Sequence, residues 1–126
     1  EADCNPALGS ANQGRRGSCQ LARLGHRVGQ LAPEKYAIFH ERIAAHSGDL
    51  AFSDAQLHAA RTVGREIESS ELASPTIAAA IRRDVDLGID LGIRILPTIV
   101  CNGQKYEGCP DDIATLTAIV LPTTDQ

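Results

Sequence analysis

Apolar residues recur every three or four positions through the first two thirds of the chain, a spacing typical of amphipathic helices. Four such segments lie between residues 18 and 91, and each begins with a residue type that favours a helix start. A hydroxyl side chain caps the first turn, and proline fits the first helical position because it has no N–H. The third start, at residues 53–56, also has the spacing of a capping box. We expect helices beginning at Ser18, Pro33, Ser53 and Ser74.

The pattern changes after Gly92, which is placed to end the fourth helix. Residues 93–101 are apolar and rich in β-branched side chains, and Asn102-Gly103 is a strong signal for a tight hairpin turn. Residues 104–107 alternate as a return strand. A last helix should open with Cys109 at its N-cap and two acids, at 111 and 112, in its first turn, where the helix dipole favours them. It should stop at Pro122.

Composition limits the class of protein. The 126 residues fit one domain, and 43% of them are hydrophobic, which is enough for a core. The net charge is −4 and the basic residues are scattered, so a nucleic-acid surface is not expected. No stretch approaches the roughly 20 apolar residues of a membrane span.

The four cysteines form no Cys-x-x-Cys pair, and their even number indicates disulfides in an oxidising compartment. Cys4 and Cys19 stand 15 residues apart, across a polar loop. We predict a disulfide between them that staples this loop to the first helix, worth roughly 3 kcal/mol. An auxiliary redox pair is the alternative. The sequence does not decide whether Cys101 and Cys109 form a second disulfide. The alternative for Cys101 is a small buried apolar residue.

Other chemistry is not indicated. The four histidines are spread over three helical segments without the spacing of a helical metal pair, and the acids at 84, 86 and 90 suit a solvated helix face. There is no Ser/His/Asp signature and no phosphate-binding loop. We expect neither a metal nor a cofactor.

The order of Gly92, residues 93–101 with Pro97, Asn102-Gly103 and Tyr106-Glu107-Gly108 resembles the carboxyl-terminal part of the thioredoxin fold. The preceding helical segment is similar to the helical insertion of the DsbA family. The motifs that carry this second likeness are Phe39-His40-Glu41, Asp49-Leu50 and the helix that begins at Ser74-Pro75. Asp3-Cys4-Asn5-Pro6 and residues 18–22 look like DsbA-like domains, including those fused to vitamin K epoxide reductase homologues.

The resemblance implies an α/β, thioredoxin-like fold of DsbA type. Residues 1–126 would form one partial domain: a loop at 1–17, a helical region at 18–91, and a cis-proline loop, hairpin and helix at 93–121. The first strand and the Cys-x-x-Cys unit of the family are missing. We expect a fragment of a longer protein, and the alternative is a chain that has lost the catalytic half. Its open sheet edge should be covered by another segment, a partner chain or a swapped copy.

The resemblance also implies thiol–disulfide exchange outside the cytoplasm, in a periplasmic or secreted protein. Leu96, Pro97 and Thr98 would bind substrate through exposed backbone, with a cis bond before Pro97, whereas this chain supplies no catalytic residue. The partners would be protein thiols or disulfides, or a redox partner such as a membrane quinone-linked oxidase. The alternative is a redox-inactive binding or assembly module that pairs a partner strand with the same backbone.

Overall fold

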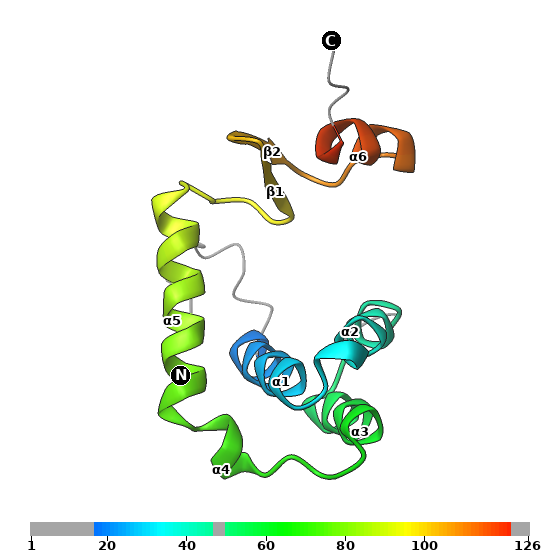
Figure 1. Cartoon of the computed structure of the whole chain (residues 1–126), viewed down its shortest axis with the longest axis vertical. Coiled ribbons are helices and arrows are strands. Elements are labelled where there is room, and N and C mark those ends of the chain that lie inside the picture. Colours follow the sequence, from blue (N-terminus) through cyan, green and yellow to red (C-terminus); the bar gives the residue numbers. More distant parts are fainter. Residues whose placement is uncertain (1–16, 47–49, 122–126) are drawn as a thin grey trace. The chain divides into compact units, whose positions relative to one another are not determined.

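The computed structural model describes residues 17–46 and 50–121, which form a mostly helical chain with one antiparallel hairpin and a final helix, as predicted (Figure 1). The chain divides into two compact units, Glu1–Leu87 and Gly88–Gln126, here called the helical unit and the hairpin unit. Within the described ranges, no helix is both long and apolar enough to cross a membrane.

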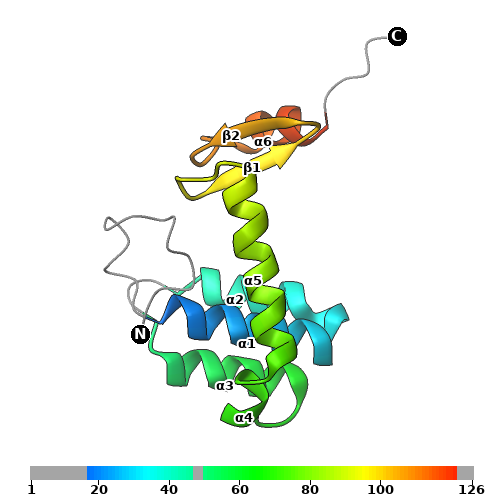
Figure 2. The ribbon, with the colours of Figure 1, turned by 90° about the vertical axis from the view of Figure 1, so that its left-hand side faces the viewer.

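The helical unit is built on three helices that pack beside one another, α1, α2 and α3 (Figures 1 and 2). Its elements are α1 (Ser18–Leu31), the 3-10 turn η2 (Pro33–Lys35), α2 (Tyr36–Ala44), α3 (Phe52–Val63), α4 (Ser69–Leu72) and α5 (Pro75–Asp90), whose last residues enter the hairpin unit. The core is mainly aliphatic and includes the ring of Phe39. It contains Leu24, Val28, Phe39, Ala55, Ala59, Ile67 and Leu72.

Two predicted N-caps are wrong, although α1 begins at Ser18 as expected. Ser18 is the first residue of α1, and the N-cap is Gly17, whose φ of 97° lies in the left-handed region that glycine tolerates. The expected capping box at Ser53 is absent, because α3 already begins at Phe52, after Ala51, with no side-chain cap. Phe52 packs against the core, which accounts for the earlier start.

The other two starts fall where the sequence placed them. The N–H of Ile77 donates to the Ser74 hydroxyl at 3.4 Å, and Pro75 is the first residue of α5. The helix predicted from Pro33 opens as the turn η2 and continues as α2 to Ala44, and its predicted end at residues 46–48 lies partly outside the described residues.

The hairpin unit contains β1 (Thr98–Cys101), β2 (Gln104–Glu107) and α6 (Ile113–Val120). Asn102 and Gly103 have φ angles of 52° and 75°, the positive values that a two-residue type I′ hairpin turn requires. Residues 93–97 form the loop that leads into β1. None of the described residues of this unit is buried, so it lacks a core of its own.

Candidate functional site

The loop that enters β1 is held by a few local contacts. Gly92 ends α5 with a φ of 64°, and the N–H of Ile93 donates to the carbonyl of Gly88 at 2.9 Å. The Thr98 hydroxyl donates to the carbonyl of Ile95, which closes the loop. The peptide bond between Leu96 and Pro97 is cis, as predicted.

Leu96 offers both side chain and backbone at the surface of this loop. Leu96 is 56% exposed. Within the described part of the chain, neither its N–H nor its carbonyl makes a backbone or side-chain hydrogen bond. The predicted site residues Leu96, Pro97 and Thr98 therefore lie together at a surface with unused backbone groups.

The register of the hairpin shows which groups of β1 are free. Cys101 pairs with Gln104 across the two-residue turn, so Cys101 and Ile99 direct their N–H and C=O toward β2. The N–H of Gly108 donates to the Pro97 carbonyl at 2.8 Å, which continues this alternation. The backbone groups of Thr98 and Val100 consequently point away from β2, along an edge that carries no strand in the described sheet.

A lysine fixes the opposite strand. Lys105 of β2 donates to the carbonyl of Gly92 at 3.1 Å and forms an ion pair with Glu107 at 3.2 Å. These contacts tie β2 to the end of α5 within the hairpin unit. They also place two charged side chains on β2, whereas β1 carries none.

The last helix is capped by an acid. Asp112 accepts the N–H of Thr115 at 2.7 Å, and this hydrogen bond holds the pKa of the Asp112 carboxyl below its usual range. The last helix thus begins later than predicted: Asp112 and not Cys109 is the N-cap, and the first turn contains no acid. The Cys101 thiol lies 3.8 Å from the carbonyl of Val120, so α6 packs against the face of the hairpin that carries Cys101.

The structure does not join Cys101 to Cys109, and both are free thiols. The register explains this. Four residues from Gln104, the partner of Cys101, to Gly108 span about 13 Å at about 3.3 Å per residue. A disulfide needs Cα atoms within about 7 Å, and the one further residue to Cys109 cannot close that gap. Cys101 is half-buried, and Cys109 is exposed.

Cys19 is disulfide-bonded. Its predicted partner, Cys4, lies outside the described residues. Cys19 is therefore not available as a free nucleophile in the helical unit.

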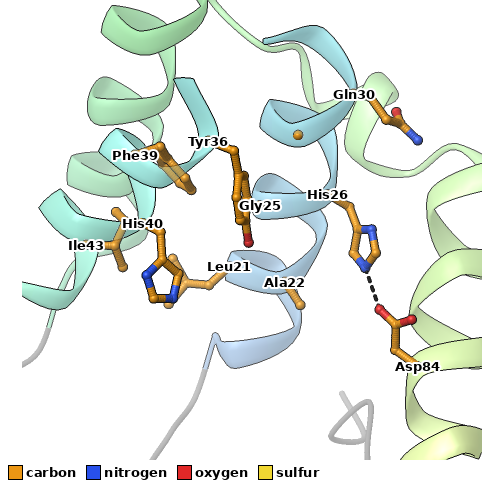
Figure 3. A pocket seen from close by; sticks show the side chains of 11 residues that line it. Leu21, Ala22, Gly25, His26, Gln30, Tyr36, Phe39, His40, Ile43 and Asp84 are labelled. Carbon is orange, nitrogen blue, oxygen red and sulfur yellow. Dashed lines mark hydrogen bonds and ion pairs between the residues drawn. The ribbon is translucent and has the colours of Figure 1, made fainter. Parts of the chain in front are cut away.

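A pocket of about 640 Å³ opens on the helical unit, between α1 and α2 (Figure 3). The Tyr36 ring lies over Gly25 and Gly29, where an added Cβ would meet it at 3.7 and 3.6 Å. At the other end, His26 Nε2 lies 2.9 Å from an oxygen of Asp84. The pocket has the size of small-molecule sites and one polar pair at its rim.

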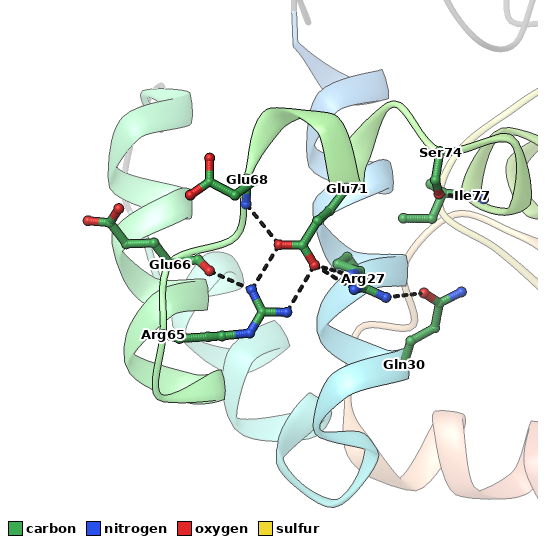
Figure 4. Close-up of polar contacts among 8 residues, drawn as sticks. All are labelled: Arg27, Gln30, Arg65, Glu66, Glu68, Glu71, Ser74 and Ile77. Carbon is green, nitrogen blue, oxygen red and sulfur yellow. Dashed lines mark hydrogen bonds and ion pairs between the residues drawn. The ribbon is translucent and has the colours of Figure 1, made fainter.

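A network of charges joins α1, α4 and the segment after α3 (Figure 4). The Glu71 carboxylate accepts from Arg65 at 2.8 and 2.9 Å, from Arg27 at 2.5 and 2.9 Å, and from the N–H of Glu68 at 3.0 Å. The hydrogen bonds from Arg65, then Arg27, hold the pKa of Glu71 far below its usual range. Glu68 and Glu71 also form a capping box for α4. The network is a structural clasp of the helical unit.

Sequence reasoning missed the pocket and this clasp. The pocket had a weak signal in the sequence, because Gly25 and Gly29 stand four residues apart in α1 and leave room for a close neighbour. The clasp had none, because Arg27 and Glu71 are 44 residues apart.

Among the described residues, no group of three or more His, Cys, Asp or Glu is placed to hold a metal. No protein-family model, curated protein or solved structure matches the chain.

Proposed function

We propose that this chain is the polypeptide-docking part of a DsbA-like protein disulfide oxidoreductase. Leu96, Pro97 and Thr98 would hold an extended, cysteine-containing segment. A Cys-x-x-Cys unit elsewhere in the full-length protein would supply the attacking thiolate. The observation that carries the proposal is Leu96, whose side chain is 56% exposed and whose N–H and C=O have no partner among the described residues.

Backbone pairing explains why this loop suits many substrates. An extended segment that adds to an exposed backbone edge gains main-chain hydrogen bonds, which do not depend on its sequence. The exposed side chains of Ile95 and Leu96 would add apolar contact to whatever residue lies beside them. The thioredoxin-like fold and its DsbA-type helical cover are part of this proposal, supported by the order of helix, loop, hairpin and helix along the chain.

The chemistry would proceed at the docked cysteine. A thiolate of the Cys-x-x-Cys unit attacks one sulfur of a disulfide, forms a mixed disulfide and releases the other sulfur as a thiolate. A second thiolate then resolves the mixed disulfide. This chain orients the substrate and takes no electron. A location outside the cytoplasm is supported by the disulfide at Cys19, because such bonds persist in oxidising compartments.

A second candidate is a redox-inactive binding or assembly module that uses the same loop. The separation of Cys101 and Cys109 along the hairpin favours it, because these two free thiols cannot act as a dithiol pair. Both candidates share the docking edge and differ in whether electrons are transferred to or from the docked segment.

A turnover assay on the full-length protein separates them. The oxidoreductase candidate predicts disulfide reduction by the full-length protein and none by the 126-residue chain alone. Leu96→Asp should raise KM for a protein disulfide, while Ile113→Asp, a matched change at a side chain that is 81% exposed in α6, should leave KM unchanged. Disulfide reduction by this chain alone would refute the claim that the attacking thiolate lies outside it. A full-length protein that binds substrate but does not reduce it would favour the redox-inactive binding module.

A further inference from the structure

The pocket between α1 and α2 gathers aromatic side chains, which are rare in this chain (Figure 3). The sequence contains only two tyrosines and two phenylalanines, and Tyr36 and Phe39 both line the pocket. The centroid of the Tyr36 ring lies 6.4 Å from that of Phe39 and 6.3 Å from that of His40, which lines the same wall. Aromatic rings contact one another at centroid distances of about 4.5–7 Å, edge to face or offset. This wall therefore offers a surface on which the ring of a ligand can pack.

The face of α1 that meets this wall leaves room for such a ring. Leu21, Gly25 and Gly29 recur every fourth residue of α1, so they share one face of the helix. The two glycines carry no side chain, and the Tyr36 ring lies against them. Tyr36 is nevertheless 40% exposed, so part of it remains open to a ligand. The pocket volume of about 640 Å³ falls within the range of about 300–1,000 Å³ that small-molecule sites have.

Asp84 gives this pocket a negative charge. Of the described residues that line it, Asp84 is the only aspartate or glutamate, and none is a lysine or an arginine. One carboxylate oxygen lies 2.9 Å from His26 Nε2, and a neutral histidine donates this hydrogen bond without cancelling the charge. The Asp84 side chain is 60% exposed, and its second oxygen has no hydrogen-bond partner among the described residues. This rim of the pocket therefore suits a cation with N–H donors and disfavours an anion.

We propose that the pocket binds a small primary amine with an aromatic body, in its ammonium form. The ammonium group donates to the free oxygen of Asp84, and the ring packs on Tyr36 and His40. An ammonium ion carries three N–H donors and no acceptor, so it complements a carboxylate that still has an oxygen to offer. Every described residue of the site belongs to the helical unit, so the proposal does not rest on the loop at Leu96.

An NMR titration of the full 126-residue chain with three probes tests the charge preference. The probes are phenethylammonium, phenethyl alcohol and hydrocinnamate, which share a phenyl ring and differ in charge. At a pH of about 7.5 histidine is mainly neutral. Phenethylammonium should shift the resonances of Gly25, Gly29 and Tyr36 and bind up to about 5-fold more tightly than the alcohol, the factor that an exposed ion pair provides. Hydrocinnamate should bind most weakly. Equal Kd values for the ammonium ion and the alcohol, a preference for hydrocinnamate, or shifts confined to other residues would overturn the proposal.

Matched variants assign the preference to particular side chains. Asp84→Asn keeps an acceptor for His26 and removes the charge, so the ammonium ion should bind no more tightly than the alcohol. Asp86→Asn changes an exposed acid of the same helix that does not line the pocket, and it should keep the wild-type preference. Tyr36→Leu should weaken all three probes, whereas Tyr36→Phe, which retains the ring, should not.

A preference that survives in Asp84→Asn, or that is lost equally in Asp86→Asn, would refute the role of Asp84. Leu96→Asp should leave the Kd of phenethylammonium unchanged, so failure of this site and failure of the docking loop are separate outcomes.

Discussion

Replacing Leu96 by alanine should weaken the docking of an extended peptide and leave the chain folded. Burying a whole leucine side chain is worth about 1.5–3 kcal/mol. Because 56% of the Leu96 side chain is exposed, covering that part would contribute roughly 0.8–1.7 kcal/mol to binding. That range corresponds to an increase of roughly 4- to 16-fold in Kd for Leu96→Ala.

Fluorescence anisotropy with a labelled peptide measures this change directly. The peptide should be unstructured, with one cysteine flanked by apolar residues. Ile113→Ala is the control, since Ile113 is 81% exposed in α6 and lies outside the loop, and it should not change Kd. A peptide N-methylated beside its cysteine should also bind more weakly, because it loses a main-chain donor. An unchanged Kd for Leu96→Ala would refute the assignment of the docking site to this loop.

Three further predictions concern the scaffold. Leu24→Ala should destabilise the helical unit by about 2–5 kcal/mol in urea unfolding, because Leu24 has no exposed surface in the core. Gly103→Ala should destabilise the hairpin by about 1–2 kcal/mol, because alanine is strained at a φ of 75°, and amide exchange in β2 would detect the loss. Glu71 has a folded pKa below its ordinary 4.5, so its contribution to stability is complete above that pH and is lost as the pH falls toward the folded pKa. The melting temperature of the protein should therefore decrease as the pH is lowered from 4.5. The Glu71→Gln variant cannot ionise at this position, so it should be less stable than the wild type at neutral pH and lose less stability in acid.

Short sequence motifs predicted the turns and helix starts whose conformation depends only on neighbouring residues. Asn102-Gly103 predicted the hairpin because few other dipeptides accept two positive φ angles in succession. Ser74-Pro75 predicted the start of α5 for a similar reason, since a capping hydroxyl and a missing N–H act within a single turn. The exposed loop at Leu96 followed from the order of these signals along the chain.

Tertiary contacts decided the parts that the sequence predicted incorrectly. The capping box expected at Ser53 does not form, because Phe52 packs against the core and α3 begins one residue earlier, at Phe52. The clasp at Glu71 joins residues far apart in the chain, and no spacing rule could have found it.

Amide hydrogen exchange on the full chain, with and without the cysteine-containing peptide, tests the central claim most directly. The proposed docking predicts that the peptide slows exchange at the Leu96 amide, which has no partner among the described residues. The amides of Ile99 and Cys101, which already face β2, should not change. Protection confined to the α1–α2 pocket, or a Leu96 amide that exchanges equally fast in both states, would contradict it.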